Sequence, residues 1–249
     1  MLGLIDYDII GYEWGFKNEG ASEEEALESV DLFINFLNMR LMLSDYKGYF
    51  TGDGNYREDA ATIQPYKGNR NQEKPIHYQA IKDYLISEHG GVVVDGMEAD
   101  DALGIEQTLV PDSIIITRDK DLRMIPGMKY YWAFRDGHES LFEVIEPEGM
   151  NFFYHQILTG DSGDHVPGLF KCTGTKASAK IKQGLNEATD KEEYILKTWI
   201  AAHYKAFSDA KVDRLDESMV RERCIKEINE IGTLLWIQRE KGVIWKMKE

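Results

Sequence analysis

Short apolar runs alternate with longer amphipathic stretches through the first half of the chain. In residues 22–42, apolar side chains recur every three or four positions, which predicts an amphipathic helix. Ser22 stands before three glutamates, as an N-cap residue does. Short apolar runs predict strands over residues 2–6, 46–51, 92–95 and 113–117, and the longer stretches between them predict further helices over 75–88 and 97–109. This alternation is typical of an α/β layer with a mainly parallel sheet.

The pattern changes near Pro147-Glu148-Gly149. Just before this point, strand-like runs over 130–135 and 141–145 flank Asp136-Gly137, which predicts a hairpin. Beyond it, strand-like runs vanish and helical periodicity dominates in residues 150–159, 176–184, 191–207 and 217–239. We therefore expect an α/β domain over residues 1–147, followed by a helical domain over residues 148–249.

Composition limits the class of protein. A chain of 249 residues that is 43% apolar has enough material for a core, which excludes a disordered or fibrous protein. Its apolar runs are far shorter than the ~20 residues that cross a membrane, and its N-terminus lacks the basic region of a signal peptide. Two cysteines cannot cross-link a chain of this length, so we expect a reducing, cytoplasmic setting.

The net charge is strongly negative. Lys and Arg total 29 and Asp and Glu total 44, which gives −15. A simple electrostatic nucleic-acid binder would be basic, and this chain is not. Either the acids serve solubility, or many of them hold divalent cations, which reverse the local sign of the charge.

Acidic residues follow each of the four predicted parallel strands. The carboxyl ends of parallel strands meet at one edge of a sheet, where active sites of such folds lie. A single acid after a strand is an ordinary turn residue, but four in four call for another explanation. The strand-end acids are Asp6, Asp53, Glu98 and Asp119; the neighbouring acids are Asp100, Asp101 and Asp121, and a third cluster holds Asp161 and Asp164.

Crowded carboxylates raise one another's pKa unless cations neutralise them. Oxygen ligands select hard ions, so we expect Mg²⁺ or Mn²⁺ and not Zn²⁺. An EF-hand is excluded because Met124 stands where its loop needs glycine. Two metal ions held by shared carboxylates suit phosphodiester cleavage. The sequence has neither a P-loop nor a Gly-x-Ser-x-Gly motif, which argues against nucleoside triphosphate hydrolysis and covalent hydrolysis.

Two basic segments stand out in this acidic chain. Residues 165–186 contain four lysines and no acid, and their glycines and helix start suit close approach to phosphate. Lys176 and Lys180 are expected to share a helix face. The second segment is Tyr66-Lys67-Gly68-Asn69-Arg70, which is placed to clamp a phosphate. The aromatic residues Tyr7, Tyr12 and Trp14 near Asp6 are candidates for stacking on bases, although core packing explains at least one of them.

Several motifs occur in an order that resembles a known family. They are Asp6 after an N-terminal strand, Tyr66-Lys-Gly-Asn-Arg70, Glu98-Ala-Asp-Asp101, Thr117-Arg-Asp-Lys-Asp121, Gly160-Asp-Ser-Gly-Asp164 and Gly174-Thr-Lys-Ala177. Together they resemble the 5′→3′ exonuclease/flap endonuclease family, especially its compact bacteriophage members and the N-terminal nuclease domain of bacterial DNA polymerase I. The resemblance covers residues 2–240.

The resemblance implies a PIN-like α/β nuclease domain followed by a helical domain with a helix–three-turn–helix motif. It implies a first metal group of Asp6, Asp53, Glu98, Asp100 and Asp101, and a second of Asp119, Asp121, Asp161 and Asp164. By the same resemblance, Lys67 and Arg70 touch the scissile phosphate and the 5′ end. The resemblance also implies that residues 166–179 form the helix–three-turn–helix motif, which grips the duplex backbone and can bind K⁺. The expected DNA-binding residues are Gly168, Lys171, Gly174, Thr175, Lys176 and Lys180.

The hairpin departs from the family pattern. Val166-Pro-Gly-Leu-Phe-Lys-Cys-Thr-Gly174 is longer than the usual Val-Pro-Gly-Ile-x-Gly-Ile-Gly, which puts K⁺ coordination and duplex affinity in question more than the chemistry. The region over residues 62–88 is also short for a helical arch, so a 5′ flap is expected to thread more loosely than in cellular members.

The expected function is a monomeric, Mg²⁺-dependent 5′ nuclease that acts on DNA with a 5′ flap, a nick or a 5′ end, in replication primer removal or repair. Mn²⁺ is expected to substitute for Mg²⁺, and RNA–DNA hybrids stay open as substrates. No membrane partner is expected, and a bacteriophage member would work in the host cytoplasm. Two alternatives remain: a PIN-type ribonuclease, and a DNA-structure-binding protein without activity.

Overall fold

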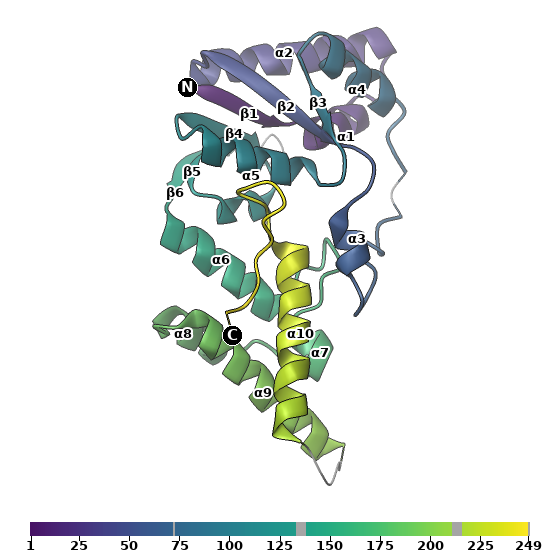
Figure 1. Ribbon diagram of the computed structural model, residues 1–249. Coiled ribbons are helices and arrows are strands. Elements are labelled where there is room, and N and C mark those ends of the chain that lie inside the picture. The colour runs from purple at the N-terminus through teal and green to yellow at the C-terminus, as the bar shows by residue number, and fades with distance from the viewer. Residues whose placement is uncertain (72, 133–137, 211–215, 249) are drawn as a thin grey trace. The chain divides into compact units, whose positions relative to one another are not determined.

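A six-stranded sheet organises the N-terminal part of the described chain (Figure 1). The computed structural model describes residues 1–71, 73–132, 138–210 and 216–248. The strand order is β3-β2-β1-β4-β5-β6, with parallel pairing from β3 through β5 and antiparallel pairing of β5 with β6. The strands are β1 (Leu2–Asp6), β2 (Asp45–Thr51), β3 (Val92–Val94), β4 (Ser113–Thr117), β5 (Gly127–Tyr131) and β6 (Ser140–Val144).

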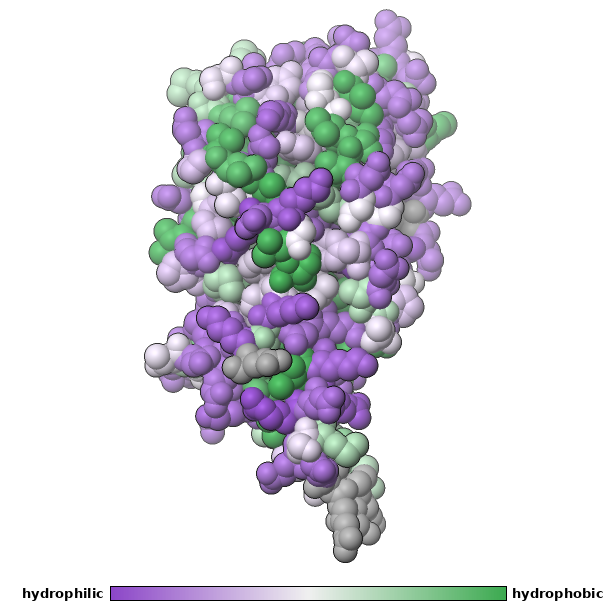
Figure 2. Space-filling model, viewed as in Figure 1, coloured by the Kyte–Doolittle hydropathy of each residue, from purple (hydrophilic) through white to green (hydrophobic). Residues whose placement is uncertain are grey.

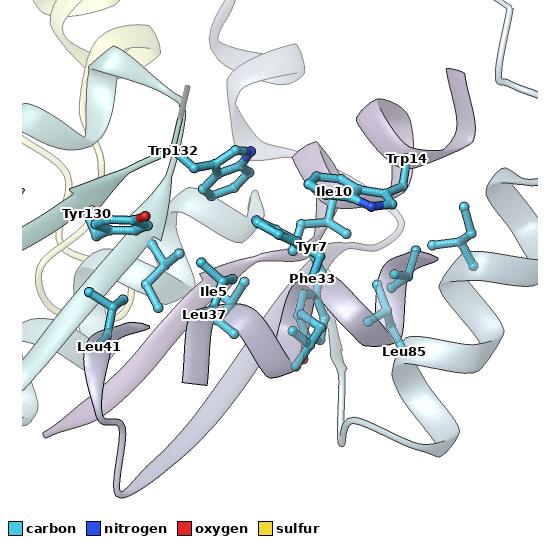
Figure 3. Close-up of a cluster of buried hydrophobic side chains, with 14 of the residues drawn as sticks. Ile5, Tyr7, Ile10, Trp14, Phe33, Leu37, Leu41, Leu85, Tyr130 and Trp132 are labelled. Atoms are coloured by element: carbon cyan, nitrogen blue, oxygen red, sulfur yellow. The ribbon is translucent and has the colours of Figure 1, made fainter. Parts of the chain in front are cut away.

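Helices cover both faces of this sheet. Residues of α1, α2 and α4 form one apolar cluster with strand residues such as Ile5 and Ile116 (Figure 3). Helix α5 packs against β1, β2 and β4 on the other face, because successive strand side chains point to opposite sides. Ser22 caps α2 in a capping box with Glu25, as the sequence predicts. These helices are α1 (Tyr7–Lys17), α2 (Glu23–Leu41), α4 (Tyr78–Ser87) and α5 (Ala99–Leu109).

The chain forms two compact units, each built from several segments. The first contains the sheet and comprises residues 1–55, 71–146 and 237–243; the second comprises 56–70, 147–236 and 244–249. The functional division into 1–147 and 148–249 stays a prediction, and the compact units differ from it in grouping 56–70 with the C-terminal helices. The helices assigned to the second unit are α3 (Tyr56–Ala60), α6 (Glu146–Thr159), α7 (Leu169–Thr173), α8 (Ala179–Glu187), α9 (Lys191–Asp209) and α10 (Glu217–Leu235).

Several predicted element boundaries change in the structure. Helix α6 begins at Glu146, so the Pro147-Glu148-Gly149 segment is helical, and proline is tolerated there because it lies in the first turn. Helix α8 begins after the N-cap Ser178, and α10 ends at Leu235. The hairpin forms between β5 and β6, but its predicted turn, Asp136-Gly137, lies outside the described residues.

The surface hydropathy and the character of the helices indicate whether the described part of the chain could cross a membrane. Hydrophilic side chains cover most of the face in Figure 2, with smaller apolar patches between them. Within the described residues, no helix combines the length and apolar character that spanning a membrane requires.

Candidate metal site and basic segments

Asp6 is the central acidic residue of the sheet's carboxyl edge, which we define as the C-terminal ends of β1, β2 and β4. It ends β1 and caps α1, where its carboxylate accepts a hydrogen bond from the Ile9 amide (Oδ1–N 3.2 Å). Its other oxygen accepts from the Thr117 hydroxyl (2.8 Å). The residue is only 2% exposed. A carboxylate is thus held at the centre of the sheet by uncharged donors.

The pKa of Asp6 is raised to about 7, chiefly by burial and also by the negative charges of Asp8 and Asp119, against the lowering effect of its hydrogen bonds. A nearby cation would favour the ionised form and relieve both unfavourable effects.

Asp119 and Asp121 follow β4 in a 3₁₀ helix, η1 (Lys120–Met124). The two acids therefore lie in a helical turn and not in an extension of the strand, in which alternate side chains would share a face. Asp119 caps this helix and accepts from the Asp121 amide (2.8 Å), while its own amide donates to the Thr117 hydroxyl (2.9 Å). The Tyr131 hydroxyl donates to the Asp119 carbonyl (2.7 Å) and fixes the turn further.

The first turn of α5 brings Glu98 to the carboxyl edge. Glu98 is the N-cap residue, is 8% exposed, and accepts a hydrogen bond from the Asn55 side chain (3.0 Å). Asp100 is half-buried in the same turn. Asp101 is fully buried, and its two oxygens accept from the backbone amides of Glu98 (3.1 Å) and Gln238 (2.9 Å). The structure therefore gives Asp101 a role in holding the helix start, and its role as a metal ligand stays a prediction.

Asp53 and Asp8 differ from the sequence expectation. Asp53 lies on an exposed turn after β2, where its amide donates to Asp95 (2.8 Å). Asp8, which the sequence reasoning missed, lies in the first turn of α1 and accepts from the Thr51 amide (3.0 Å). Its charge repels both Asp6 and Glu98. Its spacing of two residues from Asp6 was a signal that could have found it.

The fit of these residues to a metal ion rests on their chemistry. Within the described ranges, no group of three or more His, Cys, Asp or Glu side chains forms a ready-made metal site. The donors at the carboxyl edge are oxygens, which suit a hard divalent cation. Asp8 and Asp119 repel the negative charge of Asp6, and a bound cation would reduce this repulsion. The donor set therefore fits Mg²⁺ or Mn²⁺.

In the second unit, Asp164 gathers the basic segment of residues 66–70. It pairs with Arg70, lies 3.9 Å from the Lys67 ammonium and accepts from the Tyr66 hydroxyl (3.0 Å). Its carbonyl accepts from the Lys67 amide (2.8 Å), and Lys67 adopts a left-handed conformation (φ 52°). Lys67 and Arg70 thus lie together, as the sequence predicts for a phosphate clamp, with one carboxylate between them.

Asp161 shapes the loop that carries Asp164. Its Oδ1 accepts from the amides of Gly163 (2.7 Å) and Asp164 (3.2 Å), and its backbone pairs with Val166. Asp161 is 9% exposed. The roles of both aspartates as metal ligands stay predictions.

The predicted DNA-binding segment forms two short helices joined by residues 174–178. Gly168 is the N-cap of α7 and Gly174, with φ 75°, ends it. Gly168 is required by close packing, because a Cβ there would lie 2.4 Å from the Gly160 nitrogen. Lys176 precedes α8 and lies over the Phe170 ring at 5.8 Å, so the helix face expected for Lys176 and Lys180 is wrong.

The other predicted DNA-binding residues keep their places around this turn. The side chains of Lys171, Lys176 and Lys180 are exposed, and the Thr175 amide donates to the Thr173 hydroxyl (3.2 Å). The segment therefore presents positive charge next to a glycine turn.

Most of the aromatic candidates near Asp6 belong to the core. Tyr7 is fully buried, and the ring of Trp14 lies 4.0 Å from that of Phe33 (Figure 3). Tyr12 is half-buried and lies 4.8 Å from the Tyr78 ring. Core packing explains two of the three, and stacking of Tyr12 on a base stays a prediction.

Comparison with known proteins gives matches in structure alone. The sequence matches no protein-family model and no curated protein. Three similar solved structures are bacteriophage T5 5′-exonuclease with bound divalent metal ions (zinc), bacteriophage T5 flap endonuclease in a pseudo-enzyme-product complex with DNA and metal ions, and the catalytic core of Rad2 in complex with DNA substrate.

The likeness extends over most of each chain at low sequence identity. The T5 5′-exonuclease is 16% identical, with 94% of this chain and 95% of that chain covered at a TM-score of 0.54. The T5 complex is 16% identical, with 91% and 98% covered at 0.50. Rad2 is 14% identical, with 99% and 83% covered at 0.54. The predicted fold class is thereby confirmed, and the chain has the α/β and helical fold of these 5′ nucleases.

Proposed function

We propose that the chain is a structure-specific 5′ nuclease, a 5′→3′ exonuclease and flap endonuclease that hydrolyses DNA phosphodiesters with two Mg²⁺ ions in replication primer removal or repair. The observation that carries the proposal is the gathering of carboxylates around buried Asp6 at the carboxyl edge of the sheet. The fold supports it, because similar structures hold divalent metal ions and DNA.

The carboxylates of the carboxyl edge would hold the metal ions. Bound divalent ions lower the pKa of a water molecule and neutralise charge on the phosphate. Asp6 would supply a buried carboxylate ligand, and the Asp119 turn and the α5 start would supply further carboxylate ligands beside it. The proposed ligands are Asp6, Asp53, Glu98, Asp100, Asp101, Asp119, Asp121, Asp161 and Asp164.

DNA would be held by the basic segments. Lys67 and Arg70 would contact the scissile phosphate and the 5′ end, after Arg70 leaves Asp164. This exchange costs little, because the Arg70 side chain is 56% exposed and such pairs contribute only ~0–1 kcal/mol. The α7–α8 hairpin would bind the duplex backbone, with K⁺ as a further proposed ligand. Phosphate contacts release counterions, so binding should weaken with salt.

The test is cleavage of a 5′-labelled flap and a nicked duplex with Mg²⁺, and with the chelator EDTA in its place. We expect products with a 5′-phosphate and a 3′-hydroxyl only with metal. Asp119→Asn should abolish cleavage. Asp112→Asn is the matched control, since Asp112 is exposed just before the same strand, β4, and at its opposite end.

Four results would contradict the proposal. Cleavage that survives chelation, or an Asp119→Asn variant with the wild-type rate, would exclude the metal mechanism. A matched RNA flap cut in preference to DNA would favour a PIN-type ribonuclease. Tight duplex binding with no product over hours would favour a DNA-structure-binding protein without activity.

A further inference from the structure

Two threonines end the strands on either side of β1. Thr51 is the last residue of β2 and Thr117 is the last residue of β4, and both strands pair with β1. Each threonine joins a carboxylate from the beginning of α1 to a backbone amide of an acidic segment. We name these contacts the Thr117 bridge and the Thr51 bridge.

The Thr117 bridge connects β1 to the start of η1. The Thr117 hydroxyl donates to Asp6 (2.8 Å) and accepts from the Asp119 amide (2.9 Å). Thr117 is fully buried, so both partners of the hydroxyl are fixed. This bridge sets the distance between Asp6 and the Asp119 turn.

The Thr51 bridge connects α1 to α5 on the other side of β1. The Thr51 hydroxyl accepts from the Ala99 amide (3.0 Å), and the Thr51 amide donates to the Asp8 carboxylate (3.0 Å). Ala99 is the first residue of α5 and lies between Glu98 and Asp100. This bridge therefore connects α1 to the helix start that carries three of the proposed ligands.

Helix capping does not account for Asp8. Asp6 already caps α1 through the Ile9 amide, and the carboxylate of Asp8 is directed to β2 instead of its own helix end. Asp8 also places a negative charge beside Asp6 and Glu98. The repulsion is unfavourable in a site without a cation, so the position of Asp8 calls for a role connected with the acidic segments.

We infer that Asp8 and Thr51 are positioning residues of the proposed metal site, and that they hold the α5 start in register with Asp6. The inference rests on the proposed function, because it concerns the proposed metal site. It adds the α5 start to the end of β1 and the Asp119 turn as segments of that site whose positions are fixed. Groups that orient metal ligands typically matter by ~10–100-fold in metal affinity or activity. Neither Asp8 nor Thr51 belongs to the motifs identified in the sequence.

The test compares Thr51→Val, which has the same shape but no hydroxyl, with Thr51→Ser, which keeps the hydroxyl. Mn²⁺ binding to the whole protein is measured by titration calorimetry without DNA. Thr51→Val should weaken binding ~10–100-fold, and Thr51→Ser should stay near wild type. Thr108→Val is the matched control. Thr108 lies on α5, whose start the Thr51 hydroxyl contacts, but its own hydroxyl donates only within that helix, to the Gly104 carbonyl.

A second pair tests Asp8. Asp8→Asn retains an oxygen that can accept from the Thr51 amide, and Asp8→Ala does not. Positioning predicts that Asp8→Asn binds Mn²⁺ more tightly than Asp8→Ala. Equal losses in the two variants would show that the charge of Asp8 matters and not its hydrogen bond, which would overturn the inference. This pair also decides the matter if Thr51→Val fails to fold.

Failure of the inference and failure of the proposed function give different results. If wild type cleaves 5′ flaps and Thr51→Val binds Mn²⁺ equally well, the inference is wrong and the function stands. If wild type binds Mn²⁺ but cuts no flap, the function is wrong, and the ratio between Thr51→Val and Thr51→Ser still tests the bridge. In an active enzyme, Thr51→Val should raise the Mg²⁺ concentration for half-maximal rate while the KM for the flap stays unchanged.

Discussion

Asp6 in the first compact unit and Asp164 in the second differ in what balances their charge. Asp6 accepts from a hydroxyl and a backbone amide, both uncharged, while neighbouring acids repel it. Asp164 instead pairs with Arg70 and lies near the Lys67 ammonium. Neutral donors hold a carboxylate in place without cancelling its charge, so the charge of Asp6 is of the kind that the proposed metal ions would balance. Asp164 has its counterions within the chain.

The difference shows why a net charge of −15 says little about function. What matters is the charge that remains after each acid has met its local partners. By this criterion the carboxyl edge keeps negative charge that a bound cation would neutralise, which is why we propose it as the metal site. The exposed lysines between residues 165 and 186, where no acid occurs, are available to phosphate.

The largest expected effect separates Asp6 from Asp164. Asp6→Asn should lower flap cleavage by more than the ~100-fold that marks a group one step removed from the metal. It should leave the melting temperature of the metal-free protein unchanged or raise it, because a buried charge is removed. Asp164→Asn should lower cleavage less. Equal losses in cleavage rates measured at saturating Mg²⁺ would contradict the comparison, because the pairing of Asp164 with Arg70 would then make no difference to its importance.

The next effect concerns DNA affinity. Replacing Lys171, Lys176 and Lys180 together by Ala should weaken duplex binding and flatten its salt dependence by ~0.9 in log–log slope for each phosphate that the variant no longer neutralises. Fluorescence anisotropy over a salt series measures both. The control replaces Lys197 and Lys205, exposed on α9, by Ala. An unchanged slope in the triple variant would show that the hairpin does not contact the DNA backbone.

The strands and their terminal acids could be predicted from the sequence, because short apolar runs and strand-end acids are local patterns. Helix α1 could not, because Gly11 and Gly15 argue against a helix by propensity. They are explained only by packing: a Cβ on Gly11 would lie 3.0 Å from the Tyr78 ring and one on Gly15 would lie 2.5 Å from Pro75. Missing α1 meant missing Asp8.

Contacts between distant parts of the chain were also beyond the sequence. Asp101 looked like any other acid of its motif, yet it accepts a hydrogen bond from Gln238, 137 residues further on. Lys176 has helical spacing to Lys180 but precedes the N-cap Ser178. In both cases the sequence identified the residue but not the group that it contacts, which is Gln238 for Asp101 and Phe170 for Lys176.

A moderate effect on stability is expected at Glu230, which tests the same comparison inside the second unit. Its carboxylate accepts from the amides of Thr62 (2.7 Å) and Ile63 (2.6 Å) and from the Thr62 hydroxyl. Glu230 is 9% exposed, so Glu230→Ala leaves these donors without a partner and should lower the free energy of unfolding by ~1–3 kcal/mol.

Urea denaturation measures that loss, and exposed Glu222 on the same helix provides the control variant Glu222→Ala. If neutral donors are enough to hold a carboxylate, Glu230→Gln should retain most of the stability. A loss equal to that of Glu230→Ala would mean that the charge itself is required there.

The smallest effect concerns Lys129, a buried cation with neutral partners and thus the reverse of Asp6. Its ammonium donates to Gln107 (2.5 Å) and to the Gly127 carbonyl (3.1 Å), and burial lowers its pKa to about 7, with a further contribution from Arg239. Between pH 7 and the unfolded value of 10.5, the unfolded chain binds the proton and the folded chain does not. Stability should therefore rise with pH by at most ~1.4 kcal/mol per unit in this window.

Burial raises the pKa of Cys172 and Cys224 to about 12, so their ionisation in the unfolded chain opposes this rise, equally in all variants. Urea midpoints at pH 8 and 9, below the range in which tyrosines ionise, should therefore rise more in wild type than in Lys129→Met. Replacement of exposed Lys197 by Met should leave the wild-type rise in place. An equal rise in Lys129→Met would mean that Lys129 stays charged in the fold. A buried charge can then be tolerated in this sheet without an external counterion, which would weaken the proposal that metal ions balance the charge of Asp6.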